Sequence, residues 1–147
     1  MKWLPLFFIS MLACIGSAGT DSESTAYHVQ LIRGTAENKP PEPNSKLLSA
    51  QEAGCFRSVF KWKSYWQISS QRVEILNGRS TRIRLNIERE VEIDLTRPEQ
   101  RLVRAFYKSK LMQCAACPRG EGRTLLGGDR DSNSAWFIVI SRKAPAE

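Results

Sequence analysis

The sequence predicts a mainly β protein, with α+β as the alternative class, built as a small antiparallel β-sandwich or half-open barrel of about seven strands. Two observations carry this prediction. Apolar and polar residues alternate over several short runs, as they do in strands that bury one face. Turn residues separate these runs at short intervals, and the chain lacks the alternation of strands with long helices that parallel sheets need. The 147 residues suffice for a single domain.

The first strand is expected at residues 26–34, where Tyr27, Val29 and Leu31 fall on one face. Residues 35–46 follow with three prolines, whose fixed φ and missing N–H exclude them from the interior of a strand ladder. This segment is therefore predicted to be an extended connection.

One short helix is expected near residues 49–59. Ser49 has a side chain that can cap the first turn, and Glu52 occupies the partner position of a capping box. Phe56 and Val59 continue an apolar stripe at helical spacing, which predicts that the helix extends almost to the end of this segment.

A period of two replaces the helical period after this segment. Residues 72–76 alternate in polarity and lead into Asn77-Gly78, a strong hairpin signal, because both central residues of a type I′ turn need positive φ. Residues 82–87 and 90–95 alternate in the same way. These runs predict consecutive antiparallel strands.

The basic cluster of Arg79, Arg82 and Arg84 is expected to be largely neutralised. Glu92 and Asp94 lie on the outer face of the next predicted strand, opposite Arg82 and Arg84 if the two strands form a hairpin. Cross-strand ion pairs then account for most of the cluster. The cluster is therefore weak evidence for an anion site.

The C-terminal third is expected to hold two strands separated by loops. Residues 102–111 are predicted to be a strand with a turn near residues 108–110, and residues 120–134 to be mostly loop. Residues 135–140 are continuously apolar, which is typical of a strand buried on both faces.

The first 18 residues have the pattern of a secretory signal peptide. Lys2 provides the positive start, residues 3–15 form an apolar run too short to span a bilayer, and Gly16 and Ala18 are the small residues that a signal peptidase requires. Cleavage after Ala18 is expected. The same pattern predicts export to the periplasm, the outer envelope or the outside of the cell.

The remaining chain is expected to have a simple organisation. Residues 19–25 form a polar tether, residues 26–142 a single β-rich domain and residues 143–147 a tail. The N-terminal segment has a competing interpretation, because Met11-Leu12-Ala13-Cys14 resembles the lipobox of bacterial lipoproteins. This resemblance implies lipidation of Cys14, with the membrane contacted only through that lipid. The match departs from the lipobox at Met11, where Leu is preferred.

Three cysteines remain after removal of the signal, namely Cys55, Cys114 and Cys117. Exported proteins meet an oxidising compartment, so a structural disulfide is expected, either Cys114–Cys117 or Cys55 with one of that pair. The odd count leaves one thiol over. Pro118 after the second cysteine predicts that the C-x-x-C motif lies in a loop rather than at a thioredoxin-like helix start. Free thiols and thiol-disulfide redox chemistry are the alternatives.

Residues 56–66 interleave aromatic and basic side chains, a composition that also occurs in nucleic-acid and carbohydrate platforms. The period of two favours a core strand instead, because it directs Phe60, Trp62 and Trp66 to one face. Lys61, Lys63 and Tyr65 then share the other face. These three residues are predicted to form a weak contact site for an anionic surface.

Catalysis is not expected. The lone histidine, His28, makes a Ser-His-Asp triad or a multi-histidine metal site hard to build. The net charge of the chain is +7. No catalytic residue, metal or cofactor is predicted. Export and the cross-strand pairing of basic residues argue against a nucleic-acid partner.

The sequence therefore predicts a non-catalytic exported cell-envelope protein that acts as a small binding or structural module. Its expected partner is another protein or an anionic envelope component. The alternative function is that of a periplasmic or lipid-anchored thiol-disulfide protein that uses Cys114 and Cys117.

Overall fold

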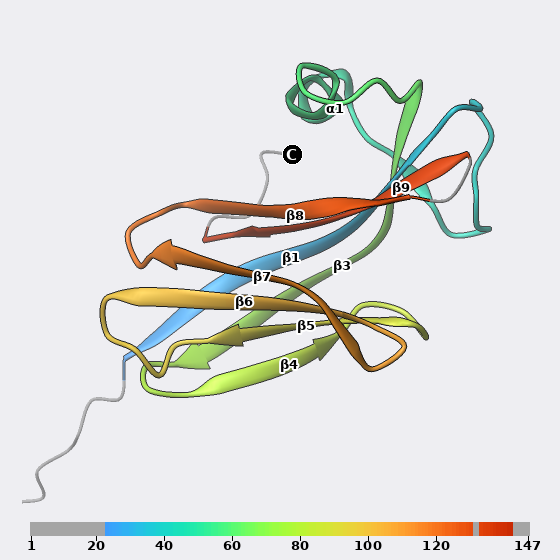
Figure 1. The fold of residues 1–147 in the computed structure, drawn as a ribbon. Coiled ribbons are helices and arrows are strands. Elements are labelled where there is room, and N and C mark those ends of the chain that lie inside the picture. The colour runs from blue at the N-terminus through green and yellow to red at the C-terminus, as the bar shows by residue number, and fades with distance from the viewer. Residues whose placement is uncertain (1–22, 131–132, 143–147) are drawn as a thin grey trace, which may run out of the picture.

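The computed structural model describes residues 23–130 and 133–142. They form two antiparallel sheets that pack face to face, with one short helix over the free side of the larger sheet (Figure 1). The predicted class, a mainly β antiparallel sandwich with one short helix, is confirmed. The expected signal peptide with Cys14, and the expected tail, lie outside the described residues.

The larger sheet has five strands in the order β2-β3-β1-β9-β8. Its strands are β1 (Ser24–Thr35), β2 (Lys46–Leu47), β3 (Ser64–Leu76), β8 (Arg123–Arg130) and β9 (Ser134–Ser141). The smaller sheet has four strands in the order β4-β5-β6-β7. Its strands are β4 (Ser80–Arg84), β5 (Arg89–Asp94), β6 (Gln100–Tyr107) and β7 (Lys110–Pro118).

The main core lies between the two sheets. Tyr27, Val29 and Leu31, which the sequence places on one face of β1, are at most 1 % exposed. Because side chains alternate along a strand, each sheet contributes every second residue to this layer. The other buried members of the cluster are Ile75, Ile83, Leu85, Val91, Ile93, Leu95, Val103, Ala105, Leu126, Ile138 and Ile140.

A second, smaller core lies on the opposite face of the larger sheet, beneath helix α1 (Ala50–Arg57). The Ser49 side chain accepts a hydrogen bond from the backbone N of Glu52 at 3.2 Å, so the predicted N-cap is confirmed. Phe56 is 2 % exposed, and its ring centroid lies 5.1 Å from that of Tyr65 and 5.5 Å from that of Phe137. These aromatic contacts hold the helix on the sheet.

Strand β9 contributes to both cores, as its continuous apolar sequence predicts. Ile138 and Ile140 point into the main core, whereas Ala135, Phe137 and Val139 point into the core beneath α1. The helix thus explains why both faces of this strand are apolar.

The predicted Asn77-Gly78 hairpin is wrong. Strands β3 and β4, which flank this dipeptide, belong to different sheets and do not pair with each other. Among the described residues, positive φ is recorded for Gly78 (82°) but not for Asn77, whereas a type I′ turn needs both. The dipeptide makes a corner between the sheets. The Arg79 backbone N donates to the Leu76 carbonyl at 3.1 Å within this corner.

The tight two-residue hairpin lies elsewhere, between β6 and β7. Lys108 and Ser109 have φ of 48° and 66°, and they are flanked by the paired residues Tyr107 and Lys110. This geometry is that of a type I′ turn, which is formed here without the glycine that usually signals it. The turn that the sequence predicts near residues 108–110 is confirmed.

Two segments expected to be loops are strands. Residues 114–118 belong to β7, and much of the expected 120–134 loop belongs to β8. Both are edge strands, since β7 ends one sheet and β8 ends the other. An edge strand that buries few side chains needs little hydrophobic alternation, so the sequence signal is weak.

Candidate functional site

Helix α1 stands over the outer face of the larger sheet (Figure 1). A groove lies between the helix and the sheet and is here called the α1 groove. Its volume is about 240 Å³. The apolar lining consists of Ile32, Leu48, Phe56 and Val139. The polar lining consists of Gln30, Gln51, Glu52, Cys55, Arg123 and Ser141. A groove that combines apolar walls with polar groups can hold a small ligand.

The floor of the α1 groove is held in place by packing. Phe56 is fixed between aromatic rings, and Val139 is 1 % exposed in the centre of the sheet. Gln30 is 6 % exposed, and its Nε2 donates to Oε1 of Gln67 at 2.8 Å. These walls are therefore already formed without a ligand, which reduces the entropy lost on binding.

Arg123 supplies the positive charge of the α1 groove. Its guanidinium carbon lies 5.9 Å from the centroid of the Phe56 ring, at the outer limit of a cation–π contact. Arg123 forms no ion pair with a residue that the structure describes, and its side chain is exposed. Glu52 lies on the same rim and carries the opposite charge. The rim can therefore accept one anionic group at Arg123, but it opposes a second.

Cys55 is the one predicted site residue that lines the α1 groove, where its thiol is exposed. Arg123, Gln30 and Ser141 were missed by sequence reasoning. They belong to β8, β1 and β9, which are far apart in the chain, so no local motif could have connected them.

Lys61 and Lys63 are exposed, as predicted, but Tyr65 is not. Tyr65 is 1 % exposed, so its expected place beside the lysines on a solvent face is wrong. Strand β3 begins only at Ser64, and α1 covers the outer face of the sheet above Tyr65. The Tyr65 hydroxyl donates to the Phe60 carbonyl at 3.1 Å, and burial raises the pKa of this hydroxyl.

The structure separates the three cysteines. Cys114 is exposed and Cys117 is buried, because residues three apart on β7 point to opposite faces of the strand. Cys55 lies on the far side of the larger sheet, and all three thiols are free. The disulfide expected among them is not formed in the described chain. The C-x-x-C motif lies in a strand rather than in the predicted loop.

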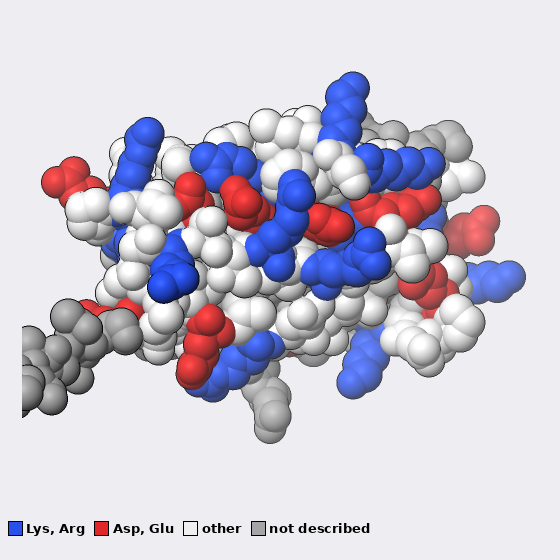
Figure 2. All heavy atoms as spheres, turned by 90° about the horizontal axis from the view of Figure 1, so that it is seen from below, with Lys and Arg blue, Asp and Glu red and all other residues white. Residues whose placement is uncertain are grey.

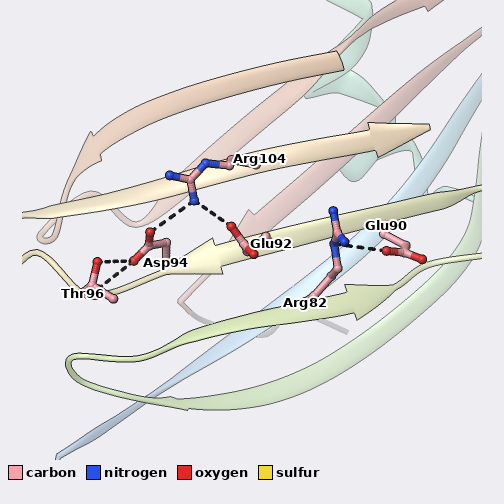
Figure 3. A network of polar contacts seen from close by, with 6 residues as sticks. All are labelled: Arg82, Glu90, Glu92, Asp94, Thr96 and Arg104. Atoms are coloured by element: carbon pink, nitrogen blue, oxygen red, sulfur yellow. Dashed lines mark hydrogen bonds and ion pairs between the residues drawn. The ribbon is translucent and has the colours of Figure 1, made fainter. Parts of the chain in front are cut away.

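The outer face of the smaller sheet is a network of opposite charges (Figures 2 and 3). Nη1 of Arg104 lies 2.7 Å from Oε1 of Glu92 and 3.2 Å from Oδ2 of Asp94. Nε of Arg82 lies 3.2 Å from Oε2 of Glu90. The predicted cross-strand pairing is found only in part. Arg82 and Arg84 both approach Glu90, at 3.2 and 3.8 Å. Glu92 and Asp94, the acids expected opposite them, pair instead with Arg104 of β6.

Asp94 accepts hydrogen bonds from both Thr96 and Arg104 in this network. Hydrogen bonds from the Thr96 hydroxyl and backbone N, at 2.6 and 2.9 Å, are the main reason that the pKa of Asp94 lies below its usual value, and Arg104 adds to the effect. Glu92 and Asp94 in turn raise the pKa of Arg104. The carboxylates of β5 are therefore engaged by arginines of this face, which reduces the positive charge that Arg82 and Arg104 offer to an anion.

A second hollow, of about 200 Å³, lies at the edge where β7 and β8 approach each other. One residue bulges out of register in each strand here, Met112 in β7 and Gly128 in β8. Nε2 of Gln113 donates to the Gly127 carbonyl at 2.9 Å. A side chain rather than a strand ladder therefore connects the two sheets, so the fold is an open sandwich and not a closed barrel.

His28, the lone histidine, lies on strand β1. Nε2 of His28 lies 2.8 Å from Oγ of Ser70, and burial lowers the pKa of this histidine. Within residues 23–130 and 133–142, no three His, Cys, Asp or Glu side chains lie close enough to hold a metal ion. None of the helices described there is long and apolar enough to cross a membrane.

No protein-family model matches the chain, and no curated protein or solved structure matches it. The class of the protein is therefore defined by its own architecture. It is a two-sheet antiparallel β-sandwich that carries a helix-covered groove on the outer face of its larger sheet.

Proposed function

We propose that this chain is a non-catalytic exported cell-envelope protein that acts as a small binding module, with the α1 groove as its ligand site. The main support for the proposal is the composition of that groove, in which a packed apolar floor lies beside one cation, Arg123, that forms no ion pair with a described residue. This arrangement favours a small apolar ligand with a single acidic group. The acid would lie at Arg123 and the apolar part against Ile32 and Val139.

Cys55 allows a direct test, because its thiol lines the α1 groove. We expect octanoate to slow the alkylation of Cys55 by iodoacetamide, measured by mass spectrometry of the folded protein. Cys114 is an internal control, since it is exposed on β7, away from the groove. If none of octanoate, octanol or another small apolar probe changes the alkylation rate of Cys55, the groove is not a ligand site.

The charge requirement is tested separately with Arg123→Gln. This change should weaken protection by octanoate about tenfold, the loss expected for one charge-assisted contact, and leave protection by octanol unchanged. Arg72→Gln is the matched control, because Arg72 is exposed on the same sheet and, among the described residues, pairs with Glu74 alone. If both arginine variants behave alike, Arg123 does not select the ligand.

Export rests on the N-terminal sequence, and its test is the N-terminus of the processed protein. Cleavage after Ala18 leaves Gly19 as the first residue. Lipidation instead leaves a modified Cys14, which would incorporate labelled palmitate and lose the label in Cys14→Ser. An unprocessed cytoplasmic chain would refute export.

The alternative, a thiol-disulfide protein, gains no support from the geometry. A dithiol pair must bring its two sulfurs within bonding distance, whereas Cys114 and Cys117 point to opposite faces of β7. Their pairing would require this strand to leave the sheet.

A further inference from the structure

We propose that one end of the molecule docks on an anionic phospholipid bilayer. This surface, here called the basic edge, consists of Leu47, Arg57, Val59, Lys61 and Lys63. Leu47 belongs to β2 and lines one hollow with Arg57 and Lys63. The other four residues lie at the C-terminal end of α1 and along the segment between α1 and β3, which Figure 1 shows at the outer margin of the molecule. The inference does not depend on the α1 groove, since none of these five residues lines that groove.

The charges of the basic edge are available to a partner. Arg57, Lys61 and Lys63 are exposed, and none of them forms an ion pair with a described residue. This separates them from Arg82 and Arg104, which acidic neighbours neutralise. Unpaired basic side chains at one end of a molecule are attracted to the negative potential of an anionic membrane.

Two aliphatic side chains accompany these charges. Leu47 is 55 % exposed and Val59 is 70 % exposed. Leu47, Arg57 and Lys63 line one hollow, so they lie on the same side of α1. Apolar side chains among basic ones favour a lipid interface over an acidic polysaccharide, because only a lipid interface offers an apolar layer beneath its charges.

The basic edge is held in shape by backbone hydrogen bonds. The backbone N of Val59 donates to the carbonyl of Phe56 at 3.0 Å, and the backbone N of Phe60 donates to the same carbonyl at 2.7 Å. Phe56 is itself fixed in the core beneath α1. Nη2 of Arg57 donates to the Lys63 carbonyl at 3.3 Å, which ties the two ends of the segment together. The exposed Val59 side chain is therefore presented on an ordered turn, and docking needs little further ordering.

The test is co-sedimentation of the full chain with vesicles. Binding to an equimolar mixture of phosphatidylglycerol and phosphatidylcholine should exceed binding to phosphatidylcholine alone, and it should fall as salt increases. All variants carry the same N-terminal segment, so its contribution cancels between them. Lys61→Gln with Lys63→Gln should weaken binding to the anionic vesicles about 25-fold, about fivefold for each lysine.

Matched variants decide whether the effect is local. Lys108→Gln with Lys110→Gln removes the same charge from the β6–β7 hairpin and should change binding little. Val59→Ser should weaken binding several-fold through the lost apolar contact, whereas Ile87→Ser, at a position 89 % exposed, should not. Circular dichroism of each variant confirms that it is folded.

The opposite results would overturn the proposal. Equal losses for the two lysine pairs would mean that only net charge matters. Equal binding to both kinds of vesicle would show that the anionic lipid is not recognised. The third opposing result concerns soluble dextran sulfate. If it competes fully with the vesicles, and if Val59→Ser does not change its binding, the partner is an acidic polymer instead.

Discussion

Gly127 and Phe137 face each other across the β8–β9 ladder, and there is no room for a side chain at the glycine. A Cβ built at Gly127 would lie 2.4 Å from Cδ1 of Phe137 and 2.9 Å from the Trp136 carbonyl oxygen. The Phe137 ring extends from this position to Phe56, which forms a wall of the α1 groove. The absence of a side chain on β8 therefore permits the packing that shapes the groove.

We expect Gly127→Ala to lower the free energy of unfolding by about 1–3 kcal/mol, because the added methyl group overpacks a site bounded by a ring and by backbone. Urea denaturation measures this change. Gly120→Ala is the control, since a Cβ there meets no atom within 4 Å. A stability loss no greater than that of the control would show that Phe137 moves aside without cost.

The cysteines should differ in reactivity in the folded protein. Cys55 and Cys114 are exposed and should react with a thiol reagent within the first labelling phase, whereas Cys117, 8 % exposed, should be protected until the protein unfolds. Mass spectrometry after brief labelling assigns the sites. Rapid labelling of Cys117, or a Cys114–Cys117 disulfide in folded protein, would contradict the position of β7 in the sheet.

The Asp94 carboxylate should contribute to the pH dependence of stability. Its pKa is lower in the folded state than the ordinary value of 3.8, because Thr96 and Arg104 stabilise the ionised form. Folding therefore favours the ionised carboxylate. This contribution is fully present above pH 3.8 and is lost as the pH falls through the lower folded pKa.

Asp94→Asn should remove this contribution and lower stability at neutral pH by about 1.5–3 kcal/mol, the range for hydrogen bonds to a charged group. Acid titration of the unfolding free energy measures both effects. Glu74→Gln is the control, since the Glu74 and Arg72 side chains are 64 % and 71 % exposed, and such pairs stabilise little. If the unfolding free energies of wild type and Asp94→Asn fall in the same way as the pH is lowered, Asp94 does not have this role.

Arg119 joins several segments at one end of the sandwich. Its guanidinium donates to the carbonyl oxygens of Leu95, Arg97 and Gln100 and to Oδ1 of Asn77, at 2.6–3.1 Å. These acceptors come from the corners that connect β3 to β4 and β5 to β6. One side chain thus holds two corners against the end of β7.

We expect Arg119→Ala to lower the free energy of unfolding by about 2–4 kcal/mol, because several acceptors lose a charged donor together. Arg119→Lys should rescue little, since an ammonium cannot reproduce the planar array of donors. The control is Arg97→Ala, which keeps the Arg97 carbonyl and removes only an exposed side chain. Thermal unfolding compares the stabilities of the three variants. Full rescue by Arg119→Lys would show that a positive charge alone is enough to stabilise the two corners.

Local patterns were sufficient where one strand or one turn decided the outcome. The alternation of Tyr27, Val29 and Leu31 identified the inner face of β1, Ser49 identified the start of α1, and the apolar run of β9 indicated burial on both faces. Each of these features depends on side-chain chemistry within a few residues, which a sequence displays directly.

Patterns failed where distant segments competed. Tyr65 alternates like an exposed residue, but α1 covers it. Asn77-Gly78 has the composition of a hairpin turn, yet the flanking strands gain more by entering different sheets, because each then pairs with another strand and buries its apolar face. Cys114 and Cys117 have the spacing of a redox motif, but the pairing of β7 with β6 places them on opposite faces.

The mainly β class, the position of the one helix and the N-terminal pattern that predicts export can all be read from local sequence. Which side chains meet depends on the tertiary structure. Gln30, Cys55, Arg123 and Ser141 line one groove because β1, β8 and β9 are neighbours in a sheet and α1 folds back over them. The physical reason is that periodicity reports which face of an element is apolar, whereas a binding surface depends on which elements share that face.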